Sequence, residues 1–170
     1  WGELVPYGMN NLGFGTSKAA PWRAGADENT TITLSHDAIV EGKPIEAGTY
    51  GLHLEVKAGD TATLILSHEA EAWGSYFYDE SEDALRVTVQ PEESPFTEWL
   101  TYDFEIRAQD HLVLSLKWEN IKIPMKIEVS DEVTLDYIRA QLRSSPAFTA
   151  DGWKNAANYC LQNNLSVIIH

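Results

Sequence analysis

Apolar residues occupy every second position along much of residues 30–129, and this pattern constrains the fold more than any other feature of the chain. Tyr50, Leu52, Leu54 and Val56 show it most clearly, because side chains two apart point to the same face of a β-strand. The pattern predicts about seven or eight strands at hairpin-like spacing. A single sheet would leave its apolar face in water, so we expect two sheets that cover each other. The residues therefore predict a mainly β protein with an antiparallel β-sandwich, of either jelly-roll or immunoglobulin-like topology.

The strand boundaries follow from turn residues. In residues 39–43, Glu41-Gly42 follows two apolar residues and predicts a tight hairpin. Gly59-Asp60 predicts another turn, and residues 112–118 and 121–129 read as two separate strands. Residues 1–29 are rich in glycine and proline, so we expect an irregular N-terminal part of the 1–129 sandwich domain.

From Ser130 the apolar spacing changes from two residues to three or four, which predicts a C-terminal α-helical hairpin over residues 130–170. Ser144-Ser145-Pro146 should end the first helix, and Thr149 should cap the second. The expected apolar face of the second helix comprises Trp153, Ala156, Ala157, Cys160 and Leu161. This pair resembles one unit of a tetratricopeptide-like array, which cannot bury its own face and should dock on the sandwich, another copy or further helices.

Charge and composition narrow the classes of function. The net charge is −14, and residues 1–129 carry 22 acidic against 9 basic side chains. Such a surface repels phosphate backbones, so we expect no nucleic-acid partner. No apolar run is long enough to predict a membrane span. The single cysteine, Cys160, excludes an intramolecular disulfide and is expected to be a buried filler on the helical stripe.

The candidate binding residues are aromatic and charged side chains near turns. Trp22, Arg23 and Glu28 flank a glycine-containing turn. Arg23 and Glu28 either form a structural ion pair or recognise a polar ligand through the guanidinium, and Trp22 either fills the core or stacks on that ligand.

A second group surrounds an acidic loop. Trp73 and Tyr76 could form a sugar-stacking platform or a satellite hydrophobic cluster. Arg86 is the only base among the acids of residues 69–98, so it is either a salt-bridge hub or a ligand clamp. We expect Trp22, Arg23 and Glu28 to converge with the loop of residues 73–76 in one polar-aromatic patch at an end of the sandwich.

Catalytic signals are weak. His53 and Glu55 share one strand face and could begin a metal site, but no third ligand is visible. His68 lacks the second histidine of a zincin motif, and no nucleophile elbow, phosphate loop or dinucleotide fingerprint occurs. The residues therefore assign no catalytic group, metal or cofactor.

Four segments together resemble the bacterial family called domain of unknown function 2911. They read WRAGADENTTI at residues 22–32, GKPIEAGTYGL at 42–52, WGSYFY with DALRV at 73–87, and EWLTY at 98–102. The resemblance covers roughly residues 1–129 and implies no agreed activity. The simplest form of the family has a shorter segment at residues 9–20, so the resemblance implies an inserted loop there. It implies export to the periplasm or beyond, through the family's usual signal sequence, and it suggests that both ends of this chain are processed or cut short.

These observations lead to two hypotheses of function. The first is an exported module that binds a small molecule, sugar or peptide through Trp22, Arg23, Glu28, His53, Trp73, Tyr76 and Arg86, with a protein partner on the helical tail. The second is a metal-dependent or carboxylate-based hydrolase with its site at the end of the sandwich, using His53, Glu55 or Glu28 beside an arginine.

Overall fold

The computed structural model describes residues 4–13, 16–57, 61–108 and 110–165, with only the backbone described for residues 10–13 and 16–18. The chain forms two compact units, residues 1–128 and residues 129–170. The predicted turn at Gly59-Asp60 lies outside the described residues.

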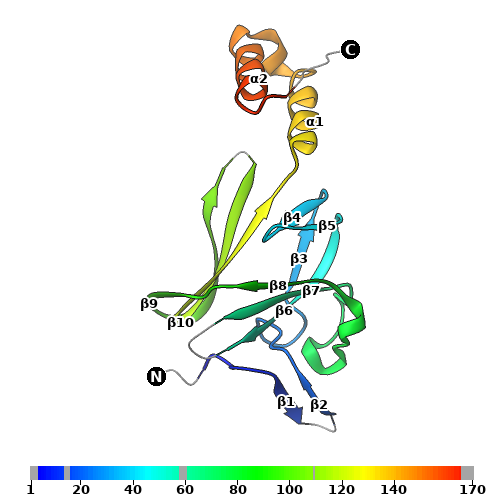
Figure 1. The fold of residues 1–170 in the computed structure, drawn as a ribbon, viewed down its shortest axis with the longest axis vertical. Helices are drawn as coiled ribbons and strands as arrows, with labels where there is room; N and C mark the ends of the chain where they lie inside the picture. The colour runs from blue at the N-terminus through cyan, green and yellow to red at the C-terminus, as the bar shows by residue number, and fades with distance from the viewer. Residues whose placement is uncertain (1–3, 14–15, 58–60, 109, 166–170) are drawn as a thin grey trace. The chain divides into compact units, whose positions relative to one another are not determined.

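Unit 1 contains two four-stranded sheets whose neighbouring strands are all antiparallel (Figure 1). The first sheet has the order β3 (Thr31–Leu34), β6 (Gly48–Val56), β7 (Ala62–Ser67), β8 (Asp83–Val89). The second has the order β5 (Lys43–Ile45), β4 (Ala38–Val40), β10 (His111–Glu128), β9 (Glu92–Arg107). The predicted antiparallel sandwich is confirmed.

The core lies where the inner faces of the two sheets meet. Leu52, Leu54 and Val56 of β6 are buried in one cluster with Ile123 and Met125 of β10. These buried residues of β6 are the alternate apolar residues of the sequence, and the residues between them point away from this core. Fully burying an aliphatic side chain contributes about 1.5–3 kcal/mol, so this cluster is the main source of stability of the sandwich.

The predicted hairpin at residues 39–43 is confirmed, with Val40 paired to Lys43. Glu41 and Gly42 have φ angles of 49° and 78°, the left-handed values that a two-residue turn with the twist of its strands requires.

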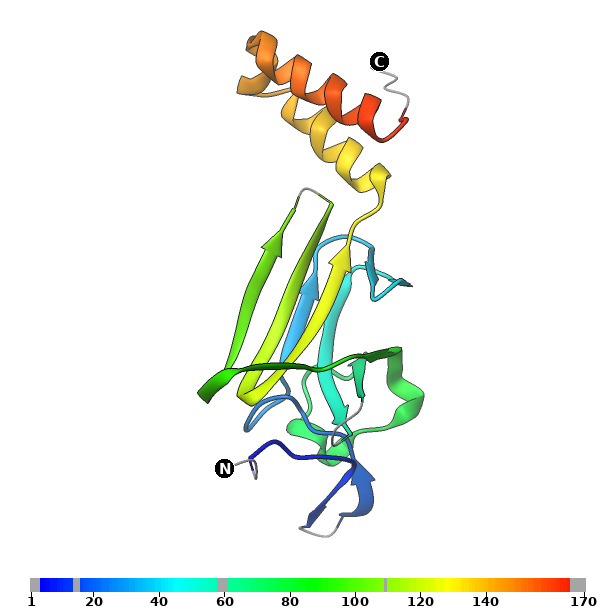
Figure 2. The ribbon, with the colours of Figure 1, turned by 60° about the vertical axis from the view of Figure 1, so that its left-hand side comes forward.

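The β9–β10 hairpin differs from the prediction, and Figure 2 shows its two strands running side by side. Residues 112–118 and 121–129 were predicted as separate strands, but residues 111–128 form one strand, β10. The apolar alternation is broken near Glu119 because the register shifts on both sides of this residue, which has a φ of 52°. Such a bulge changes the face that follows without ending the strand.

Residues 9–20, predicted as an irregular insertion, also differ. They form a hairpin of β1 (Asn10–Gly13) and β2 (Thr16–Ala20). Backbone pairing holds these strands together, and a sequence with little apolar alternation gives no sign of it.

Two short 3₁₀ helices, η1 (Gly74–Phe77) and η2 (Glu80–Glu82), connect β7 to β8. Unit 2 contains α1 (Asp131–Gln141), a 3₁₀ turn η3 (Ser145–Phe148) and α2 (Ala150–Gln162). None of the helices in the described part of the chain is both long and apolar enough to cross a membrane.

The two predicted helices are confirmed. Thr149 caps α2 as expected, since its hydroxyl accepts a 3.1 Å hydrogen bond from the backbone N–H of Gly152. Cys160 is buried as expected, but the apolar face differs from the prediction. Tyr159 is buried beside Cys160, whereas Leu161 is 76% exposed.

Candidate functional site

The turn at residues 22–29 is fixed to both sheets. Trp22 pairs with Leu54 of β6 through two backbone hydrogen bonds of 2.8 and 2.7 Å. The next residues turn sharply, with φ angles of 53° at Ala24 and 65° at Asp27. The Tyr102 hydroxyl on β9 donates a 2.6 Å hydrogen bond to the Ala24 carbonyl. The turn is therefore held from the first sheet on one side and from the second on the other.

The indole ring of Trp22 stacks on that of Trp118 from β10, with centroids 5.6 Å apart and planes at 26°. Both indole N–H groups are already bonded to backbone. Trp22 Nε1 donates to the Gly25 carbonyl at 3.4 Å, and Trp118 Nε1 donates to the Glu98 carbonyl at 3.1 Å. The faces of the rings, rather than their N–H groups, are left for other contacts.

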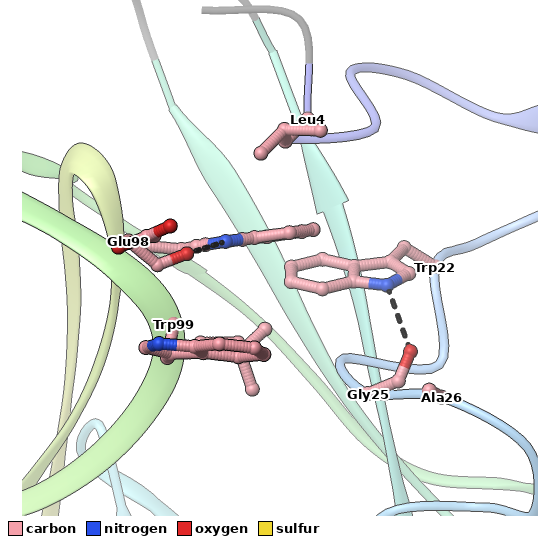
Figure 3. A pocket seen from close by; sticks show the side chains of 8 residues that line it. Leu4, Trp22, Gly25, Ala26, Glu98 and Trp99 are labelled. Atoms are coloured by element: carbon pink, nitrogen blue, oxygen red, sulfur yellow. Dashed lines mark hydrogen bonds between the residues drawn. The ribbon is translucent and has the colours of Figure 1, made fainter.

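A pocket of about 430 Å³ opens beside this stacked pair (Figure 3). We call it the tryptophan pocket, and its lining residues are Leu4, Trp22, Gly25, Ala26, Glu98, Trp99, Leu100 and Trp118. Figure 3 shows the Trp22 ring nearly edge-on, with Leu4 on one side of its plane and Trp99, Gly25 and Ala26 on the other. Glu98 is the only lining residue with a charged side chain.

Trp99 and Trp118 were not among the predicted site residues. Trp99 stands in the EWLTY segment and is 79% exposed. The hairpin register places Lys117 opposite Thr101 and Glu119 opposite Thr97, so Trp118 falls across from Trp99. If the segments that carry Trp99 and Trp118 had been paired as the two strands of one hairpin, the sequence would have predicted that the two indoles are neighbours.

The Trp22 turn lies beside the loop of residues 73–76, as expected. Asn29 binds the segment that leads into this loop twice, through N–H to the Ala72 carbonyl at 3.2 Å and through Nδ2 to the Glu69 carbonyl at 2.9 Å. Arg23 lies against Gly74 so closely that a Cβ there would stand 2.7 Å from Arg23 Cδ.

The expected ion pair between Arg23 and Glu28 is not formed. Among the described residues no ion pair within 4.0 Å involves either of them. The reason is that Glu28 is exposed, while Arg23 is directed to Gly74 with its Nε buried. The Trp22 ring packs on Trp118 instead of contributing to a patch around Arg23.

His53 is enclosed on the outer face of β6. It is 2% exposed, its Nδ1 lies 2.9 Å from Ser75 Oγ, and its ring centroid is 5.3 Å from that of Tyr78. Burial lowers the pKa of His53 to about 4, because the imidazolium would lose its hydration there. The described residues contain no group of three or more potential metal ligands, and Glu55 does not join His53 in one.

Arg86 is the centre of a salt-bridge cluster, which is one of the two roles predicted for it. Its Nη1 lies 2.9 Å from Asp83 Oδ2, 2.9 Å from the Tyr78 hydroxyl and 3.5 Å from Glu80 Oε1. Burial raises the pKa of Asp83, while hydrogen bonds from Tyr78 and Arg86 act in the opposite direction.

Trp73 and Tyr76, the predicted aromatic platform, do not line the tryptophan pocket. Trp73 is 52% exposed, and Tyr76 is half-buried.

Comparison with known proteins identifies the family. The model of the family described as "Protein of unknown function (DUF2911)" matches residues 1–127, and the chain belongs to this family. No curated protein and no solved structure matches the chain.

Proposed function

We propose that this member of the DUF2911 family is an exported ligand-binding module and that the tryptophan pocket is its binding site. One observation carries the proposal: Trp22, Trp99 and Trp118 come from three separate segments and line one opening. Ligand sites in proteins are concave and mostly apolar, with aromatic walls and few polar groups. Export rests on the family resemblance alone.

The exposure of Trp99 supports this assignment. An indole that is 79% exposed leaves a large apolar surface in water, which costs free energy unless something covers it. A ligand that stacks on Trp99 would remove that cost.

Backbone strain at the walls is a second line of support. Ala24, within the turn, and Glu119, beside Trp118, have φ angles of 53° and 52°. Non-glycine residues in this region cost about 1–3 kcal/mol each and cluster at functional sites. Strain next to two lining residues, Gly25 and Trp118, fits a site whose shape matters more than its stability.

The test is a binding screen with oligosaccharides, short peptides and small organic molecules, read by calorimetry on wild type, Trp99→Ala and Trp73→Ala. Both indoles are more than half exposed, so neither change should alter the free energy of unfolding by more than about 0.5 kcal/mol. A ligand of wild type should be lost in Trp99→Ala and kept in Trp73→Ala.

Two results would contradict the proposal. One is a ligand that depends on Trp73 and not on Trp99, which would move the site to the predicted patch around residues 73–76. The other is silence across every ligand class.

A protein-interaction role for unit 2 is a second candidate. Tyr137, Phe148 and Leu161 are 64%, 90% and 76% exposed, which is the kind of apolar surface that protein partners cover. The resemblance of the two helices to a tetratricopeptide-like unit is part of this second proposal, because such units bind proteins. The hydrolase hypothesis gains less support, because His53 is enclosed by Ser75 and Tyr78 rather than open to a substrate.

A further inference from the structure

Resting on the proposed function of the tryptophan pocket, we propose that its ligand is an organic cation with a fully alkylated, quaternary ammonium head group. The walls offer the faces of aromatic rings, and the negative face of an indole attracts a cation within about 6 Å of the ring centroid. Trp22 and Trp118 form one stacked surface, and Trp99 stands on one side of the Trp22 plane (Figure 3). Three tryptophans around one opening are the arrangement that recognises a weakly hydrated cation.

The hydrogen-bonding capacity of the pocket argues against a hydroxyl-rich ligand such as a sugar. Trp22 Nε1 and Trp118 Nε1 already donate to the carbonyls of Gly25 and Glu98. A sugar would bring many donors and acceptors into a site that could satisfy few of them, and each unpaired group costs free energy. A quaternary ammonium group has no N–H and therefore brings no hydrogen bonds that need a partner.

Charge in the walls favours a cation. Glu98 is an exposed lining residue of the pocket, and no described residue forms an ion pair or a side-chain hydrogen bond with its carboxylate. No basic side chain is among the lining residues. Unpaired negative charge beside aromatic faces adds Coulomb attraction to the cation–π contact.

A second carboxylate lies behind the wall. Glu119, next to Trp118 in the chain, is only 5% exposed. Its Oε2 accepts a 3.4 Å hydrogen bond from the backbone N–H of Val5, and its Oε1 has no partner among the described residues. Val5 follows Leu4 in the chain and Glu119 follows Trp118, so this weakly satisfied carboxyl group is held between two segments that line the pocket.

The experiment compares three probes of similar size by calorimetry on the full chain. Choline carries the alkylated cation, 3,3-dimethylbutan-1-ol is its neutral isostere, and ethanolamine carries a strongly hydrated primary ammonium. Choline should bind roughly tenfold or more tighter than either of the other two. Equal binding of the neutral isostere would overturn the charge assignment, and equal binding of ethanolamine would overturn the alkylated head group.

Glu98→Gln provides the variant, with Glu93→Gln on the same strand as the matched control. Glu98→Gln should weaken choline binding by roughly three- to tenfold and leave the neutral isostere unchanged, whereas Glu93→Gln should change neither. An unchanged affinity for choline in Glu98→Gln would count against the inference. If choline does not bind wild type, the inference fails. A Trp99-dependent ligand of another class would then still uphold the proposed function.

Discussion

The hydroxyl of Tyr102 donates a 2.6 Å hydrogen bond to the carbonyl of Ala24, 78 residues earlier in the chain. Tyr102 belongs to β9, and Ala24 is the fully buried, left-handed residue of the turn that forms one wall of the tryptophan pocket. This bond joins the first and the last of the four family segments. It also holds the turn against the hairpin that carries Trp99 and Trp118.

Tyr102→Phe should lower the free energy of unfolding by about 1–3 kcal/mol, because it leaves a buried carbonyl without a partner. Chemical denaturation measures the change. Tyr137→Phe is the control, since the Tyr137 ring is 64% exposed and its loss of a hydroxyl should cost less than about 0.5 kcal/mol. Equal effects in the two variants would show that the bond to Ala24 contributes nothing.

Gly74→Ala should destabilise the protein by more than a left-handed glycine normally does. Gly74 has a φ of 61°, and an added Cβ would lie 2.7 and 2.8 Å from Arg23 Cδ and Nη1. Gly42→Ala separates the two causes, because Gly42 has a φ of 78° with nothing within 4 Å of its would-be Cβ. We expect about 1 kcal/mol for Gly42→Ala and about 1 kcal/mol more for Gly74→Ala. Similar losses of stability would mean that Arg23 does not pack against the loop.

The enclosed imidazole of His53 predicts acid sensitivity. Its pKa is lowered from 6.5 to about 4, so the unfolded chain binds a proton in this window that the folded chain does not. Stability should therefore be fully present above pH 6.5 and fall as the pH drops toward 4, by on the order of 3 kcal/mol in total.

Urea denaturation of wild type and His53→Gln at pH 7.5 and 4.5 checks this. The carboxylates titrate in both proteins, so the difference between their two pH dependences isolates the histidine. His36→Gln, at an exposed site, should behave like wild type. Identical acid sensitivity in His53→Gln and wild type would refute the account of this residue.

Arg86→Met should destabilise the protein by about 2–4 kcal/mol, because the side chain of Asp83 is only 6% exposed and would lose its cation. Arg139→Met breaks the similarly spaced pair with Asp136, where both side chains are more than a third exposed, and should cost less than about 0.5 kcal/mol. Thermal unfolding of the two variants side by side gives the comparison. Comparable shifts would show that burial of Asp83 has no energetic consequence.

Sequence periodicity was enough to predict the sandwich, because strands such as β6 bury every second residue against a single core. Periodicity failed to predict strand boundaries where backbone conformation, rather than apolar spacing, determines them. The left-handed Glu119 shifts the face of β10 without ending the strand, and the β1–β2 hairpin shows no apolar alternation. The turn at Glu41-Gly42 was predicted correctly, because these two residues themselves adopt the φ angles that the turn requires.

The site was harder to predict than the fold. Trp22 was identified from its segment, but its neighbours Trp99 and Trp118 are brought to it by strand register. Arg23 and Glu28 are close in sequence, yet Glu28 is exposed while Arg23 lies against Gly74 with its Nε buried. Sequence proximity therefore pointed to the wrong partner for Arg23, while the many acids around Arg86 in the sequence favoured a salt-bridge hub, which is one of the two roles predicted for it.

The most direct test of the tryptophan pocket is nuclear magnetic resonance of the indole N–H signals during a titration with choline. The sequence has 6 tryptophans, which single Trp→Phe variants can assign. The account predicts saturable shifts of the Trp22, Trp99 and Trp118 signals, while those of Trp73 and Trp153 stay in place. Saturable shifts centred on Trp73, with Trp99 and Trp118 unmoved, would contradict it.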